Sequence, residues 1–164
     1  IPALLGEGDQ ADSGGGSKNG ADGAGNSEAI AVVAADDFDP YGDGEEHSED
    51  VGLAWDDDEA TAWHTENYSS PLEAQKPGVG VLFDLGETHD VGSIELAGDP
   101  GEIEVRYAQE SGANADDFDV AAEGSDLQIE FDQPIAARYW LVWITQLPNG
   151  TGTASIAEAT FRGP

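Results

Sequence analysis

The sequence contains no cysteine and no methionine, and it has very few basic residues. Without cysteine the chain has no disulfide framework, no thiolate nucleophile and no cysteine-ligated zinc site. Over 164 residues, 5 lysines and arginines stand against 35 aspartates and glutamates, a formal net charge of −30 at pH 7. Binding to nucleic acid or to an anionic membrane surface requires a patch of positive charge. The composition therefore excludes both kinds of partner.

Long apolar runs are also missing. None approaches the roughly 18 residues that a membrane-spanning helix requires. The apolar stretch at 1–5 is too short for a signal peptide and lacks a basic region before it. The length of the chain suits about one domain.

Aromatic residues are absent from the first part of the chain and concentrated in the rest. Residues 1–28 contain none and consist mostly of Gly, Ala, Ser, Asp and Asn, whereas 29–164 hold all 4 Trp, 4 Tyr and 5 Phe. A Gly-rich polar segment behaves as a flexible coil and cannot bury a core. We therefore expect a flexible, disordered linker over 1–28 and a folded domain over 29–164.

The acidic residues of the domain are scattered among apolar positions, with only short clusters such as 56–58 and 116–117. In about 1 M salt the Debye length falls to roughly 3 Å, so neighbouring like charges hardly repel one another. Scattered acid with almost no lysine is the pattern expected of a folded surface adapted to high salt.

The domain has the pattern of an all-β protein. Short segments with apolar residues at alternate positions are separated by Gly, Pro and Asp, which predicts an antiparallel β-sandwich of about eight strands. The segment at 139–145 is apolar on both faces and so is expected to be central, with Trp140 and Trp143 on opposite faces. Only a weak helical turn is indicated, near 46–53. The expected strands lie at 30–34, 78–85, 91–96, 103–108, 127–131, 139–145 and 155–161, the last with a bulge or turned end.

Two acidic segments contain residues of the kinds that bind cations. The four consecutive acids at 56–59 precede Thr61, and Ca²⁺ prefers six to eight oxygen ligands of mixed kind. The alternative is an exposed acidic turn with Trp63 in the core. The segment 39–50 places Asp and Gly at some positions of an EF-hand loop, but Tyr41 stands where a carboxylate or amide is required. An ordered turn is the favoured interpretation of this second segment.

Aromatic side chains in loops are candidates for stacking on a sugar ring. Tyr41, Trp55 and Tyr68 lie in predicted loops and are the ligand-binding candidates. Catalysis has little support, because the three histidines lie far apart in sequence and none has a recognisable nucleophile nearby. We therefore expect a protein that is not an enzyme.

Taken in order, several motifs resemble the discoidin-like, galactose-binding-like jelly-roll domain. Such domains occur at the extracytoplasmic C-terminus of actinobacterial MviN-type lipid II flippases and of related kinase-like proteins. The resemblance covers about 29–164 and implies a β-sandwich of eight strands that binds a ligand outside the cell without catalysis. It rests on the segments 38–45, 56–68, 76–81, 84–86, 137–145 and 156–158.

The same resemblance implies a structural calcium ion beside the acidic turn. The usual ligands of that superfamily, a turn aspartate, the following threonine and a glutamate near the C-terminus, match Asp56, Thr61 and Glu158. Backbone carbonyls near Ala54 and Asp58 would join them. The chain departs from the familiar turn at Asp57, where glycine is usual, so the loop conformation is expected to differ.

The leading hypothesis is a non-catalytic extracytoplasmic binding module, tethered to the cell membrane through residues upstream of Ile1. Its partner is a cell-wall glycan or an extracytoplasmic protein. The alternative is a structural or protein-interaction domain that positions a peptidoglycan-precursor flippase or its regulators. A hydrolase that acts through acidic side chains is the least favoured of the three hypotheses.

Overall fold

The structure is a computed structural model that describes residues 28–164. The predicted linker at 1–28 and the apolar stretch at 1–5 lie outside the described residues, apart from Glu28. The described part of the chain forms eight β-strands and three short 3₁₀ turns. In chain order these are β1 (Ala29–Ile30), β2 (Ala34–Phe38), η2 (Ser48–Ala54), β3 (Trp63–His64), η3 (Leu72–Ala74), β4 (Val79–Asp99), β5 (Glu102–Ala108), η4 (Ala115–Asp117), β6 (Asp119–Gly124), β7 (Gln128–Gln146) and β8 (Ser155–Arg162).

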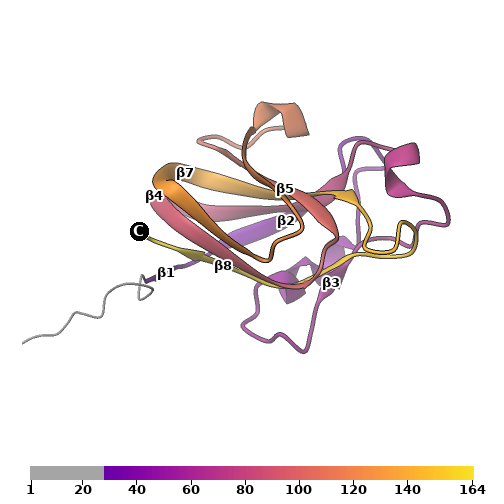
Figure 1. Ribbon diagram of the computed structural model, residues 1–164, viewed down its shortest axis with the longest axis horizontal. Helices are drawn as coiled ribbons and strands as arrows, with labels where there is room; N and C mark the ends of the chain where they lie inside the picture. The colour runs from indigo at the N-terminus through magenta and orange to yellow at the C-terminus, as the bar shows by residue number, and fades with distance from the viewer. Residues whose placement is uncertain (1–27) are drawn as a thin grey trace, which may run out of the picture.

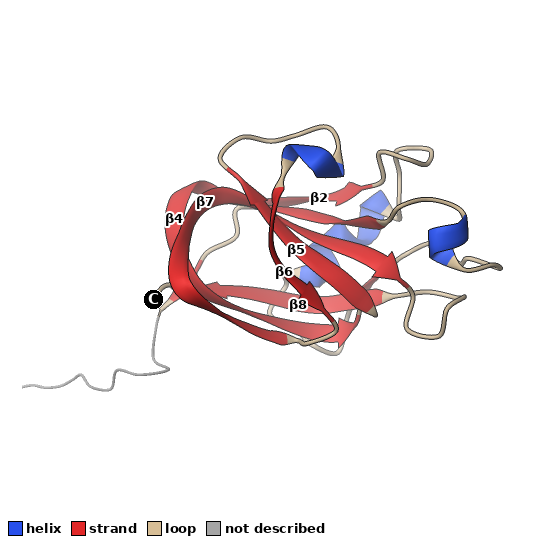
Figure 2. Ribbon diagram, turned by 45° about the horizontal axis from the view of Figure 1, so that its top comes forward, coloured by secondary structure: helices blue, strands red, loops and turns tan. Residues whose placement is uncertain are grey.

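All strand pairs are antiparallel, and two long strands run through both layers of the sandwich (Figure 2). The first half of β4 pairs with β2 and with the second half of β7, which in turn pairs with β5; β6 forms the edge of this layer. The second half of β4 pairs with the first half of β7 and with β8, which also carries β1 and β3. The predicted all-β antiparallel sandwich is confirmed.

The bend in β4 explains why two predicted strands are one element. The predicted segments 78–85 and 91–96 both belong to β4, and the register with β7 shifts between Asp84 and His89. Gly86 lies in this interval with a φ of 85°, a conformation that glycine adopts without steric cost. The predicted segments 127–131 and 139–145 likewise merge into β7. The bent pair folds one layer over the other.

The core lies between the two layers and is closed by aromatic contacts across them. The ring of Phe161 lies 5.6 Å from Phe83 and 6.0 Å from Trp140. Phe131, near the bend of β7, stacks on the same Trp140 ring at 5.8 Å. At the packed interface of β4 and β7, a Cβ on Gly80 would lie 1.9 Å from a backbone oxygen of β7, so only glycine fits.

A second, smaller apolar cluster covers the outer face of the layer that contains β2. The segment around η4 packs over it, and the Phe38 ring meets Phe118 and Trp143 edge-on, each at 5.8 Å. Trp140 therefore lies in the main core and Trp143 in the outer cluster, as the alternation of the strand predicts. Both tryptophans are buried.

The loops that follow β2, β3 and β7 gather at the end of the sandwich opposite the C-terminus (Figure 1). The segment after β3 is hydrogen-bonded to the segment before β8 through Thr65 and Ala154 and through Tyr68 and Gly152. In the described part of the chain no helix is long and apolar enough to cross a membrane.

Candidate functional site

The acidic turn at 56–61 brings together all three residues predicted as calcium ligands. The hydroxyl of Thr61 donates to the Asp56 carboxylate at 2.5 Å and lies 3.0 Å from the Asp58 carbonyl oxygen. Glu158, from β8, accepts a hydrogen bond from the backbone N–H of Asp57 at 2.9 Å. Residues about 100 positions apart therefore form one oxygen-rich corner.

The turn reaches this shape because its backbone bends sharply at Asp57, whose φ is 62°. The usual glycine of the familiar turn is absent, and an aspartate adopts the left-handed conformation in its place, which aspartate tolerates better than most residues. The left-handed conformation occurs at the residue whose backbone N–H donates to Glu158.

The pKa values of two carboxyls in this corner are shifted in opposite directions. The hydrogen bond from Thr61 is the main cause that holds the pKa of Asp56 below its usual value. Burial raises the pKa of Glu158, and the neighbouring charges of Asp57 and Asp56 raise it further. A positive charge placed among these oxygens would relieve that repulsion.

The corner has a mixed set of oxygen donors. Asp56 and Glu158 supply carboxylates, Thr61 a hydroxyl and Asp58 a backbone carbonyl, which are the kinds of oxygen that Ca²⁺ accepts. Within residues 28–164 no group of three or more His, Asp or Glu side chains is arranged around a common metal position. A cation here would depend on the hydroxyl and the carbonyl as well as on the carboxylates.

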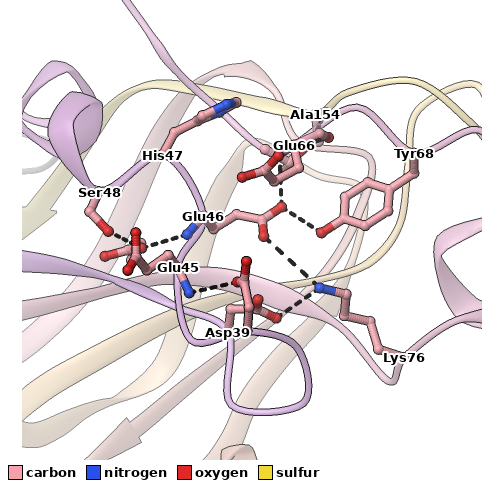
Figure 3. A network of polar contacts seen from close by, with 12 residues as sticks. Asp39, Glu45, Glu46, His47, Ser48, Glu66, Tyr68, Lys76 and Ala154 are labelled. Atoms are coloured by element: carbon pink, nitrogen blue, oxygen red, sulfur yellow. Dashed lines mark hydrogen bonds and ion pairs between the residues drawn. The ribbon is translucent and has the colours of Figure 1, made fainter.

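A second polar centre lies at the loop end of the sandwich and contains a half-buried lysine between two buried carboxylates (Figure 3). The ammonium of Lys76 lies 2.9 Å from Asp39 and 4.0 Å from Glu46, and 5.1 Å from the centre of the Tyr68 ring. Glu46 also accepts hydrogen bonds from the Tyr68 hydroxyl at 2.5 Å and from the N–H of Glu66 at 2.8 Å. The network ties the loop after β2 to the segment after β3.

Burial dominates the electrostatics of this network. It raises the pKa of Asp39 and of Glu46, and in both cases Lys76 opposes the shift. Burial and the hydrogen bond to Glu46 raise the pKa of Tyr68. Asp39 and Glu46 each keep one buried oxygen without a hydrogen-bond donor, so two carboxylates depend on one ammonium.

The three aromatic candidates for sugar binding have different environments. Tyr41 is 41% exposed, and its ring meets the edge of Trp143 at 6.1 Å. Trp55 is half-buried against the core beside a shallow groove of about 390 Å³. Tyr68 is only 7% exposed, because its hydroxyl points inward to Glu46. The expectation of an exposed platform is therefore wrong for Tyr68.

The sequence did not single out Glu46 or Lys76 for any role. Glu46 is one of many acids, and nothing in its neighbourhood marks it as fully buried. Lys76 carries a signal in retrospect, because it is the one lysine of the described domain. Asp39, the first residue of the near-EF-hand segment, forms an ion pair with this lysine at 2.9 Å.

The loop that carries Tyr41 is held in place by contacts of the residues on either side of Tyr41. Asp39 anchors its start through Lys76, and Gly42 lies so close to this ion pair that a Cβ would meet the Asp39 carboxylate at 2.3 Å. Asp43 then accepts a hydrogen bond from the N–H of Glu45 at 3.0 Å. The exposed ring is thus presented by an ordered loop.

No protein-family model matches the chain, and no curated protein matches it either. Solved structures do share its fold. The family 32 carbohydrate-binding module of NanJ from C. perfringens, solved with galactose, matches with a TM-score of 0.60 and 25% identity over 81% of this chain and 96% of that one. A chitosan-binding module from Paenibacillus sp. IK-5 matches with a TM-score of 0.61 and 18% identity over 83% and 99%.

A third structure, the family 32 module of AlyQ in complex with an unsaturated mannuronic acid, matches with a TM-score of 0.58 and 16% identity over 82% and 97%. These neighbours are carbohydrate-binding modules with a galactose-binding-like, discoidin-type sandwich. The described domain therefore has this fold, and the resemblance seen in the sequence is confirmed at the level of fold.

Proposed function

We propose that the domain is a non-catalytic glycan-binding module. The observation that carries this proposal is the match to the galactose-bound module of NanJ, which extends over nearly the whole of that module at 25% identity. The exposed Tyr41 ring on an ordered loop supports it, because a rigid aromatic face is the group that stacks on a sugar ring. Order in the free protein lowers the entropic cost of binding.

The charge of the domain narrows the class of glycan. Each lysine and arginine of the described residues has a carboxylate partner within 4.0 Å, so an acidic sugar would have to compete for every cation. A neutral hexose, with galactose as the first probe, is the favoured ligand of the Tyr41 surface. The pairs are Lys76–Asp39, Arg106–Glu104, Arg138–Asp84 and Arg162–Glu95.

A glycan array followed by titration calorimetry tests the proposal. Tyr41→Ala should weaken binding of the best glycan by roughly tenfold, since ring contacts contribute about 0.5–1.5 kcal/mol beyond area burial. Tyr41→Phe keeps the ring and should bind like the wild type. If no glycan on the array binds, and cross-linking in cells recovers a protein partner instead, the module is a protein-interaction domain.

The proposal includes a structural calcium ion at the corner formed by Asp56, Thr61 and Glu158. Supporting it are the mixed oxygen donors and the raised pKa of Glu158. At a hundredfold excess over Kd, such an ion would add about 2.7 kcal/mol to the free energy of unfolding. EDTA should therefore lower Tm in the wild type and in Glu59→Ala, but not in Asp56→Ala. An EDTA-insensitive wild type would contradict the calcium site.

The module is further proposed to act outside the cell membrane on cell-wall glycan, as part of a longer protein. The motif order that resembles flippase and kinase-like C-terminal domains supports this placement. The sequence upstream of Ile1 is the direct test. A run of membrane helices there is the expected result, and a cytoplasmic catalytic domain would contradict it.

The acidic surface is proposed to be an adaptation to salt. With a net charge of −30, self-repulsion should destabilise the fold at low ionic strength, and added salt should screen it. Tm should therefore rise steadily as KCl is raised to about 1 M. A flat or falling curve would argue against salt adaptation.

A further inference from the structure

One edge of β8 is covered by short strands at its two ends and is open between them. β1 pairs with Phe161 and Arg162 of β8, and β3 pairs with Ser155 and Ile156. The other edge of β8 is occupied by β4 along nearly its whole length. Within the described residues no strand pairs with 157–160 on the edge that β1 and β3 share, and Figure 1 shows these two strands at opposite ends of β8.

The backbone in this gap has groups that a further strand could use. Successive residues of a strand direct their N–H and C=O groups to alternate edges, so at least one residue of 158–160 presents both groups to the gap. At about 3.3 Å per residue, the stretch from Ile156 to Phe161 spans roughly 16 Å, enough for an added segment of about four residues. An unpaired strand edge is a template for pairing with another chain.

A groove of about 390 Å³ lies beside the gap. Its lining comes from the segment before β2, from the turn after η2 and from the open stretch of β8. Ile30, Val32 and Trp55 line it and are each only half-buried, so a ligand in the groove can contact their side chains. Asp57 and Glu158 are its charged residues, and no Lys, Arg or His of the described chain lines it.

We propose that this gap binds an extended basic peptide segment of a partner protein, which adds to β8 as a short strand between β1 and β3. The β8 backbone supplies the hydrogen bonds, apolar side chains of the peptide pack on Trp55, and lysines at alternate positions pair with Asp57 and Glu158. A second copy of this chain is a disfavoured occupant, because each copy carries a net charge of −30.

The inference goes beyond the proposed function, because it concerns a different surface and a peptide instead of a glycan. The loop of Tyr41 follows β2, whereas the groove is lined by residues before β2, after η2 and within β8. Binding at either surface can therefore fail without the other.

The experiment is an NMR titration of the isotopically labelled full chain with a blocked octapeptide of alternating valine and lysine. Calcium-free buffer at about 0.1 M salt keeps Glu158 available and limits screening. Saturable shifts should centre on the backbone amides of 157–160. Two further peptides carry N-methyl groups on the valine amides or on the lysine amides, which lie on opposite edges of an extended chain. One of them should lose at least about tenfold in affinity, since several hydrogen bonds are removed, and the other should not.

Variants of the protein place the peptide in the groove. Ala31→Trp fills the groove from an exposed position and should abolish binding, whereas Ala74→Trp, exposed on η3, should bind like the wild type. An unchanged circular dichroism spectrum confirms that both variants fold. Asp57→Asn should weaken binding roughly threefold, because an exposed ion pair is lost, and asparagine also tolerates the left-handed backbone at this position. Glu73→Gln is its control for overall charge and should have no effect.

Four results would overturn the inference. The first is the absence of saturable shifts at 157–160. The second is equal affinity for all three peptides, which would mean that no strand is added. The third is equal loss in Asp57→Asn and Glu73→Gln, or equal affinity for a peptide with glutamate in place of lysine. The fourth is binding of galactose at these amides without binding of the peptide, which would make the groove a sugar site.

Discussion

Replacement of Lys76 by methionine tests the buried network directly. The variant keeps the apolar stem of the side chain but leaves Asp39 and Glu46 without their shared ammonium. Both carboxylates are buried, at 3% and 0% exposure. Removing one partner of a buried ion pair typically costs about 3–5 kcal/mol. That cost is a large share of the roughly 5–15 kcal/mol that stabilises a domain.

The loss of unfolding free energy in Lys76→Met should increase as the pH rises. Burial raises the folded-state pKa of Asp39 and of Glu46 above the values of 3.8 and 4.5 of the free groups. Each carboxyl then contributes stability that is fully present below its unfolded pKa and is lost as the pH rises through the raised folded pKa. Loss of Lys76 raises both folded-state pKa values further. The penalty should therefore be largest near neutral pH and smaller near pH 5.

Urea unfolding followed by circular dichroism at these two pH values measures the effect. Arg138→Met provides the comparison, because Arg138 and its partner Asp84 are more exposed and solvent screens their attraction, so the loss of this pair should cost much less. If Lys76→Met costs no more than Arg138→Met, or costs the same at both pH values, the two carboxyls are not ionised together in the native protein.

Three further predictions concern packing, hydrogen bonding and the cation site. Gly80→Ala should destabilise the sandwich strongly, because the added Cβ would overlap a backbone oxygen of β7. Gly52→Ala should be tolerated, because no atom lies within 4 Å of the added Cβ. Thermal unfolding of the two variants compares these effects. Tyr68→Phe should cost about 1–3 kcal/mol in urea unfolding, because Glu46 loses a buried donor. Apparent calcium affinity, measured by calorimetry, should fall as the pH is lowered from neutral, because protons compete for Glu158, whose pKa is raised; an affinity independent of pH would contradict this.

Most of the longer strands were predictable, because each buries alternate residues and leaves a visible period. The strand expected at 30–34 is wrong, because 31–33 lie between β1 and β2 and belong to neither. The bends of β4 and β7 were not predictable, since the two strands pair again after the register shift between Asp84 and His89, where the polar residues look like a turn in sequence. β6 was missed because its residues are small and acidic and form an edge strand. The bulge expected in the last strand is confirmed by the register shift opposite Gly98.

One of the two candidate sites was predicted from the sequence and the other was not. The corner of Asp56, Thr61 and Glu158 came from a resemblance, because no periodicity relates residues about 100 positions apart. The buried network could not be predicted, since the burial of Glu46 depends on the loop that Lys76 holds. Tyr68 was misjudged for the same reason, because a loop position in sequence does not reveal that the loop folds inward.

We propose that the loop end of the sandwich binds a neutral sugar through Tyr41. The most direct measurement is an NMR titration of the isotopically labelled chain with galactose and galactose-terminated oligosaccharides. We expect saturable shifts of the backbone amides around Tyr41 that Tyr41→Ala removes. The absence of any saturable shift, or shifts confined to surfaces away from this loop, would contradict it.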